Sequence, residues 1–225
     1  MTALAHLHSL AQPDTAQRDD VFANIAQDIY AQGYCIQPMA LPPDLAEDLW
    51  AYVQQTGHHK FDAAGIGRGQ AFLKNEFVRT DEILWINGDT QVGQRWLNWT
   101  EALKQYLNRR LLLGLFSFES HFSHYAPGDY YKRHMDAFRC QANRVLTVVA
   151  YLNPGWDSTD GGELVLYRDE SDHQGIKVTP LMGTLAVFLS EEFPHEVLPA
   201  KRDRYAIAGW YRVNGSVANR IDPPR

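Results

Sequence analysis

Residues 115–213 form a series of short apolar segments separated by turn-forming residues. The first segment, "LFSFESHFSHY", places Phe116, Phe118 and Phe122 on one face and mostly polar side chains on the other. This period of two predicts a β-strand. The segments that follow are "RVLTVVAYLN", "GELVLY", "IKVTP", "GTLAVFL", "HEVLP" and "RYAIAGWYR", with turn signals such as "NPGW", "STDGG" and "AKRD" between them. Many short strands at this spacing predict an antiparallel jelly roll.

The first half of the chain has helical periodicity instead. In "DDVFANIAQDIYAQG", Phe22 and Ile29 lie on one helical face, Asp19 or Asp20 is positioned to cap the start, and Gly33 to end the helix. "YCIQP" follows as a short expected strand.

Two further helices are expected. "PPDLAEDLWAYVQQTG" has Pro43 near its first position and Gly57 beyond its end. A strand "ILWI" then precedes a long helix over about 92–112, with Trp96 and Leu107 in its buried stripe. The expected architecture is therefore mainly β with packed helices, a double-stranded β-helix preceded by N-terminal helices.

We expect one domain over residues 18–225, after a flexible tail at 1–17. Its parts would be a helical support at 18–112 and a jelly-roll core at 115–213. A glycine-bearing segment at about 58–80 lacks the strand-then-helix frame of a phosphate loop, so we expect a mobile loop there.

Composition restricts the function classes. The net charge of −6 disfavours a protein that works on nucleic acid or an anionic membrane surface. Cys35 and Cys140 are far apart, which fits a reducing cytoplasm and no disulfide framework. The N-terminus has no signal-peptide pattern, and no apolar run is long enough for a membrane span. A cytoplasmic monomer is expected.

"YYKRHMDAF" contains a His-x-Asp pair, His134 and Asp136. On an extended segment the two side chains project from one face, but a chain with 9 histidines produces such pairs by chance. Beyond Asp136 only His173, in a polar loop, and His195, at the start of a strand, remain. His134, Asp136 and His195 would form a facial triad, which binds Fe(II) and leaves positions open for a cosubstrate and O2.

Arg204 opens the segment "RYAIAGWYR". Alternation puts this long cation on one face with Ala206, Ala208 and Trp210, which leaves a cavity along the strand. Arginine presents a planar fork suited to a carboxylate. In "RVLTVVAYLN", the residues sharing a face are Val145, Thr147, Val149 and Tyr151. A pocket that is apolar along its length and polar at its closed end fits a dicarboxylic keto acid.

Some of these residues also have a simpler interpretation. Tyr125 and Trp210 are nearly as well explained as core aromatics. His121 and His124 are three apart on an expected strand, so they should point to opposite faces rather than form a second metal site.

"HMD", "GGEL", "PHEV" and "RYAIAGWY", in this order, resemble the Fe(II)/2-oxoglutarate-dependent dioxygenases. The similarity is to the prolyl hydroxylases that modify hypoxia-inducible factor and to their bacterial relatives. "YLN" at 151–153, "TDGG" and "RTDEILWI" match as well, and the resemblance covers about residues 60–212. One departure is that the segment between Tyr125 and His134 is one residue shorter than in the animal enzymes.

The resemblance implies roles for individual residues. His134, Asp136 and His195 would bind Fe(II). Arg204 and Tyr151 would bind the distal carboxylate of 2-oxoglutarate, with Tyr125 near its iron-chelating end. The residues shaping the pocket would be Thr147, Val149, Val197 and Trp210. The residues lining the substrate entrance would be Tyr131, Arg133 and Arg144, with Arg79 and Asp81 at the base of the mobile substrate loop.

The implied activity is hydroxylation of a prolyl C4 in a protein, with O2 as oxidant and release of succinate and CO2. Ascorbate would stimulate such an enzyme, and a low affinity for O2 would suit oxygen sensing. Elongation factor Tu is a candidate target, because a bacterial relative acts on it. Two alternatives remain: the same chemistry on a free amino acid or other small molecule, and a non-catalytic jelly-roll binding module.

Overall fold

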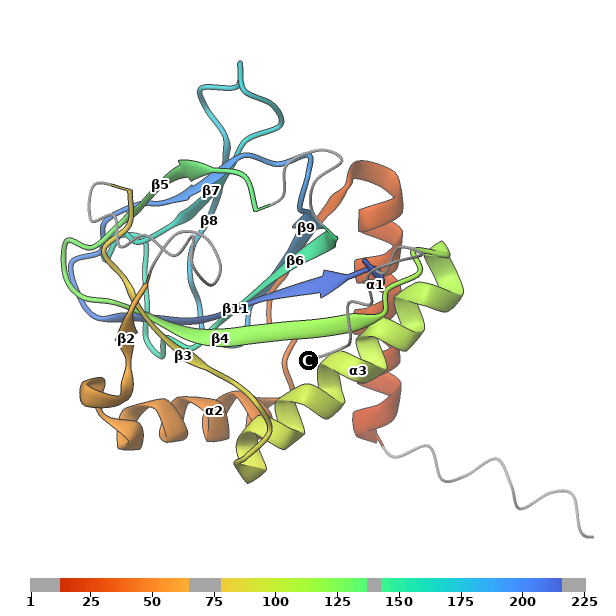
Figure 1. The fold of residues 1–225 in the computed structure, drawn as a ribbon, viewed down its shortest axis with the longest axis horizontal. Coiled ribbons are helices and arrows are strands. Elements are labelled where there is room, and N and C mark those ends of the chain that lie inside the picture. The colour runs from red at the N-terminus through yellow and green to blue at the C-terminus, as the bar shows by residue number, and fades with distance from the viewer. Residues whose placement is uncertain (1–12, 65–77, 137–142, 216–225) are drawn as a thin grey trace, which may run out of the picture.

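The computed structural model describes residues 13–64, 78–136 and 143–215 of the chain. Two antiparallel sheets face each other, and helices cover the outer face of the larger sheet (Figure 1). The structure confirms the expected fold, a mainly β double-stranded β-helix with helices packed on it.

The larger sheet has seven strands. In spatial order they are β1 (Tyr34–Gln37), β9 (Leu185–Leu189), β6 (Arg144–Tyr151), β11 (Arg204–Arg212), β4 (Ser117–Tyr125), β3 (Glu82–Trp85) and β2 (Asp62–Ala63). The smaller sheet has four, in the order β5 (Tyr131–His134), β10 (His195–Val197), β7 (Leu164–Leu166) and β8 (Ile176–Val178). The strands of the smaller sheet are only three or four residues long, so their positions depend strongly on side-chain contacts.

The helices are α1 (Pro13–Gln32), α2 (Pro43–Thr56) and α3 (Gln91–Leu111), with a short 3-10 turn η1 (His58–Lys60). Helix α1 starts five residues before residue 18, so the expected tail boundary is wrong, and Asp19 and Asp20 lie inside the helix rather than at its cap. Proline is compatible with the first helical position, where its missing N–H is not needed. Thr90 caps α3 by accepting a hydrogen bond from the Gly93 N–H at 3.1 Å.

Each central strand of the larger sheet contributes to two apolar cores. On β11, Tyr205, Ile207 and Tyr211 pack against the helices, whereas Ala206 faces the smaller sheet. The odd-numbered positions of β6 from Thr147 onward line the same inter-sheet side, as alternation predicts. The inter-sheet space therefore contains the residues expected to form the pocket.

Val145 departs from this pattern. It was expected on the pocket face, but it packs against the helix-side core. The register between β6 and β11 shifts here, because Leu146 pairs with Tyr211 while Arg144 pairs with Arg212. One extra residue on one strand of a bulge reverses the facing of that residue, which alternation alone does not reveal.

None of the helices in the described ranges combines the length and apolar character needed to cross a membrane.

Candidate active site

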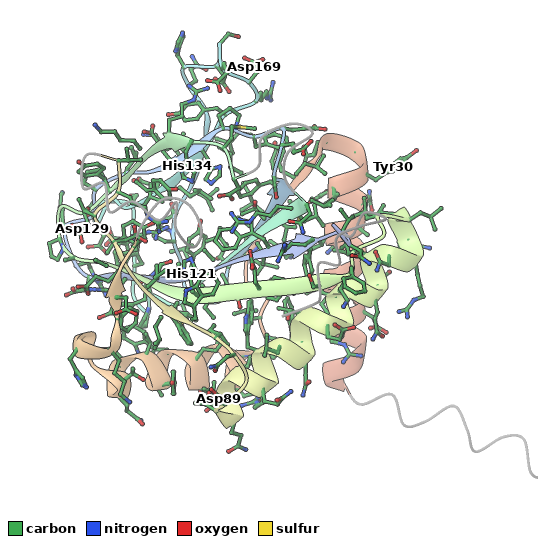
Figure 2. The ribbon with its side chains drawn as sticks, in the orientation of Figure 1. Tyr30, Asp89, His121, Asp129, His134 and Asp169 are labelled. Atoms are coloured by element: carbon green, nitrogen blue, oxygen red, sulfur yellow. The ribbon has the colours of Figure 1, made fainter. Side chains whose placement is uncertain are left out.

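Three potential metal-binding side chains meet between the sheets. His134 ends β5, Asp136 lies two residues further on, and His195 begins β10 directly opposite His134. The distance from His134 Nε2 to Asp136 Oδ1 is 3.7 Å, and from His195 Nε2 to Asp136 Oδ2 it is 3.5 Å. Donor atoms of all three residues lie within 4.8 Å of one another. Figure 2 shows His134 in the space between the two layers of strands.

Backbone carbonyls set the orientation of both imidazoles. His134 Nδ1 lies 2.8 Å from the carbonyl oxygen of Lys132, and His195 Nδ1 lies 3.0 Å from that of Phe193. A carbonyl only accepts, so each Nδ1 carries the proton and each Nε2 keeps its lone pair. Both lone pairs are then available to one metal ion, with Asp136 beside them.

The ionisation states suit a divalent metal. Burial, together with nearby His134, lowers the pKa of His195 to about 4, so this imidazole is neutral near pH 7. Burial would raise the pKa of the Asp136 carboxyl, but the two neighbouring histidines outweigh burial and hold this pKa well below its usual range. A neutral imidazole and an ionised carboxylate are the forms that bind a metal.

Two hydroxyls support the Asp136 carboxylate. Thr147 Oγ1 donates to Asp136 Oδ2 at 2.8 Å, and it lies 2.9 Å from Ser190 Oγ. Because the single Thr147 proton is directed at the carboxylate, Ser190 must be the donor in the second hydrogen bond. Sequence reasoning expected Thr147 as pocket wall and did not find Ser190, although a serine ending the apolar run "AVFLS" is the signal that would have indicated it.

Arg204, the first residue of β11, is almost fully buried, with 1% exposure. Its Nε donates to the carbonyl oxygen of Gly162 at 2.7 Å, and its guanidinium packs 4.9 Å from the Tyr125 ring centroid and 5.3 Å from that of Tyr151. Within the described part of the chain, no carboxylate forms an ion pair with Arg204. A buried cation without a counter-charge favours an anionic ligand.

Tyr151 strengthens this interpretation. Its hydroxyl is buried and has no hydrogen-bond partner among the described residues. Burial raises the pKa of Tyr151 to about 12, so the hydroxyl remains a donor. The Tyr151 hydroxyl is a buried donor without an acceptor, and the neighbouring Arg204 guanidinium has no ion-pair partner among the described residues. A carboxylate could accept hydrogen bonds from both groups. The side chains of this site therefore fit both an iron ion and the distal carboxylate of 2-oxoglutarate.

The structure also brings the other expected pocket residues to this space. Tyr125, Val149 and Val197 are buried in the inter-sheet core, in the same cluster as Ala206. Trp210 is buried with its indole N–H unpaired among the described residues. Its ring lies 3.8 Å from the Arg144 guanidinium carbon. The described residues of this inter-sheet core are thus mostly apolar, with few unpaired polar atoms, a composition that suits a small-molecule site.

The expected entrance residues divide into three groups. Arg79 forms a two-pronged ion pair with buried Asp81, at 2.7 Å for each contact, and covers the Tyr131 ring at 4.3 Å. Tyr131 stacks on the imidazole of His134 with centroids 3.5 Å apart. These three residues therefore connect the end of the 58–80 segment to His134. Residues 65–77 of that segment, expected as a mobile loop, lie outside the described residues.

Arg144 and Arg133 make different contacts. Arg144 pairs with Glu119 at 3.1 Å, beside Trp210. Arg133 is directed away from the pocket and donates to the backbone carbonyls of Asp169 at 2.6 Å and Asp172 at 2.9 Å. Arg133 thus holds the β7–β8 turn.

Two residues that form a chain of ring contacts with Trp210 were not expected at the site. Trp85, at the end of β3, is 53% exposed and meets the His121 ring at 5.1 Å, and His121 in turn meets Trp210 at 5.5 Å. His124 stacks instead on Tyr205 on the helix side, as expected for opposite faces. In the part of the chain that the structure describes, His134, Asp136 and His195 are the one three-donor cluster found.

Residues 120–212 match the model of the 2OG-Fe(II) oxygenase superfamily. A Pseudomonas putida prolyl-4-hydroxylase of known structure is 36% identical, with a TM-score of 0.76, and the match covers 87% of this chain and 100% of that one. This chain belongs to the 2OG-Fe(II) oxygenase superfamily. Members of this family use Fe(II), 2-oxoglutarate and O2, and the donor set of this oxygenase fits them.

Other relatives of this oxygenase are also prolyl hydroxylases. A Trichoplax adhaerens prolyl hydroxylase, solved in complex with a hypoxia-inducible factor oxygen degradation domain peptide, is 28% identical with a TM-score of 0.75, covering 88% of this chain and 92% of that one. The hypoxia-inducible factor prolyl hydroxylase of Caenorhabditis elegans is 30% identical over 191 residues, 72% of this chain. The oxygenase spans only 26% of that worm protein.

Proposed function

We propose that this oxygenase hydroxylates C4 of a prolyl residue in a protein target, with conversion of 2-oxoglutarate to succinate and CO2. The observation that carries the proposal is the unpaired Arg204–Tyr151 end of a pocket whose other end holds three metal-binding side chains. A keto acid with two carboxylates can occupy both ends at once. The relatives described above are prolyl hydroxylases, which supports proline as the target.

In this proposal each residue has a defined task. His134, Asp136 and His195 hold Fe(II), which with 2-oxoglutarate and O2 supplies an oxidant able to attack an unactivated C–H bond. Arg204 and Tyr151 bind the distal carboxylate and so fix the direction in which the keto acid enters. The apolar walls at Val149 and its neighbours exclude water, which protects the reaction from side chemistry.

The mouth of the pocket supports a protein target. Exposed Trp85, next to His121 and Trp210, offers aromatic surface for a prolyl ring. Arg79 and Tyr131 join the 58–80 segment to the metal-binding strand, so a target that contacts this segment is brought close to the site. Elongation factor Tu is the target we propose to test first, and we propose that the oxygenase acts as a cytoplasmic monomer.

The decisive test is mass spectrometry of proteins from the native host, with and without the gene. The expected result is a target peptide with a proline heavier by one oxygen atom, which is absent when the gene is deleted. Purified enzyme with Fe(II) and 2-oxoglutarate should then modify the same proline of elongation factor Tu. Modification of another protein would exclude only elongation factor Tu, whereas succinate release driven by a free amino acid and by no protein would favour the small-molecule alternative.

A further inference from the structure

The pairing of the two histidine-bearing strands is irregular. His195 pairs with His134, and Val197 pairs with Tyr131. The two pairs are therefore three residues apart along β5 but only two apart along β10. Lys132 and Arg133 both fall opposite the single residue Glu196, which is the two-against-one arrangement of a bulge. The backbone alone therefore holds the two imidazoles weakly in register, although they must share one metal ion.

Three side chains fasten this bulge from the face opposite the metal site. Tyr167, just after β7, donates its hydroxyl to the carboxylate of Glu196. The Arg133 guanidinium carbon lies 3.8 Å from the Tyr167 ring centroid. We call Arg133, Tyr167 and Glu196 the back-face bracket. Arg133 directly precedes His134, and Glu196 directly follows His195. Because side chains alternate along a strand, the histidines point to one face of the sheet and these two neighbours to the other.

Tyr167 holds the chain on both sides of His195. Its backbone N–H donates to the Pro194 carbonyl oxygen at 2.8 Å, and its hydroxyl reaches Glu196. The Tyr167 side chain is well buried, at 8% exposure. Arg133 then connects the bracket to the β7–β8 turn through the Asp169 and Asp172 carbonyls. Figure 2 marks Asp169 on this turn, which projects beyond the smaller sheet.

We propose that the back-face bracket positions His134 and His195 for metal binding, and that the Tyr167–Glu196 hydrogen bond is its central contact. Partners outside the ligand set commonly tune metal affinity by fixing ligand orientation. Here the fixing acts through the backbone of β5 and β10, because the bracket touches the residues next to the ligands. The inference rests on the proposed function only through the metal, and requires no particular target.

Mn(II), as a stable substitute for Fe(II), allows the bracket to be tested without turnover. Tyr167→Phe and Glu196→Ala each remove the central hydrogen bond and should raise the Mn(II) dissociation constant about 3- to 10-fold in calorimetric titration, less than for partners bonded directly to a ligand. Glu196→Gln keeps an acceptor for Tyr167 and should stay within about twofold of wild type. Tyr30→Phe, at a residue 84% exposed on α1, is the matched control and should change nothing.

A double-mutant cycle and a spectrum separate positioning from stability. The Tyr167→Phe/Glu196→Ala protein should lose no more Mn(II) affinity than either single variant, because both substitutions remove the same hydrogen bond. The visible absorption of bound Co(II), which reports coordination geometry, should change in the single variants.

Wild-type affinity and an unchanged Co(II) spectrum in these variants would overturn the inference, even if thermal stability fell. Equal losses in Glu196→Gln and Glu196→Ala would overturn it too, since charge would then carry the effect. Failure of the wild-type chain to bind Mn(II) or Fe(II) would contradict the proposed function itself.

Discussion

The Arg204 guanidinium is held by the carbonyl oxygen of Gly162, which accepts the Nε proton at 2.7 Å. Among the described residues, no carboxylate forms an ion pair with the outer nitrogens of Arg204. Gly162 has φ +70, and a Cβ there would lie 2.9 Å from the Ala200 Cβ and 3.1 Å from the Arg204 Cδ. Glycine at 162 is therefore part of the arrangement that aims Arg204.

Replacing Arg204 or Gly162 should weaken the use of 2-oxoglutarate. Arg204→Ala should raise the KM for 2-oxoglutarate at least about thirtyfold, since losing one partner of a buried charge pair costs about 2 kcal/mol or more. Gly162→Ala should raise the same KM several-fold by displacing Arg204. Gly155→Ala is the control, because Gly155 has a similar φ of +61 but nothing within 4 Å of an added Cβ. An unchanged KM in Arg204→Ala would place the cosubstrate elsewhere.

The Thr147 hydroxyl should matter for the metal rather than for the cosubstrate. Thr147→Val removes the donor to Asp136 Oδ2 and the acceptor of Ser190, so metal affinity should fall about tenfold, the lower end for partners bonded to a ligand. Titration with Mn(II) measures this effect. Thr56→Val removes another buried threonine hydroxyl, bonded within α2 to the Tyr52 carbonyl, and should leave affinity unaltered. Equal affinities in the two variants would show that Thr147 only fills space.

Metal removal should reduce stability through His134, Asp136 and His195. Mn(II) at about 100 times its dissociation constant should stabilise the wild-type protein by about 2.7 kcal/mol relative to chelated protein. His134→Ala and Asp136→Ala should lose this stabilisation together with target-stimulated succinate release. His173→Ala, at an exposed position in the β7–β8 turn, should keep both. Normal turnover in Asp136→Ala would mean that Asp136 does not bind the metal.

His121 should make the apoprotein less stable in acid. Burial lowers the pKa of His121 to about 4, below its ordinary value of 6.5. Between these pH values the unfolded chain binds the proton and the folded chain does not, so stability falls as pH falls from about 7 to 4. The contribution is about 3 kcal/mol, since one pKa unit corresponds to about 1.4 kcal/mol.

Denaturant unfolding of chelated protein across this pH range measures the effect. His121→Leu should reduce the pH dependence and leave the part that His195, whose pKa is also lowered to about 4, contributes, whereas His173→Leu should change neither part. An equal slope for wild type and His121→Leu would show that folding does not lower the pKa of His121.

The periodic patterns in the sequence were sufficient for much of the fold. Alternation along "RYAIAGWYR" predicted that Arg204 and Ala206 face the pocket, and the helical stripe with Trp96 and Leu107 is fully buried. Local patterns work there because the direction of a side chain follows from the period of its own strand or helix. The sequence predicted that His134 and Asp136 project from one face of an extended segment and that His195, at the start of a later strand, joins them. The structure brings the three side chains together.

Contacts between segments distant in the sequence required the tertiary structure. Val145 faces the helices because of a register shift between β6 and β11, and Arg133 binds the β7–β8 turn rather than opening toward the pocket. The partnership of Ser190 with Thr147, and of Tyr167 with Glu196, joins residues that no local pattern relates. The sequence by itself determined which side chains could form the site. Strand register and bulges decided which of them touch, because those depend on the energy of packing the whole sheet.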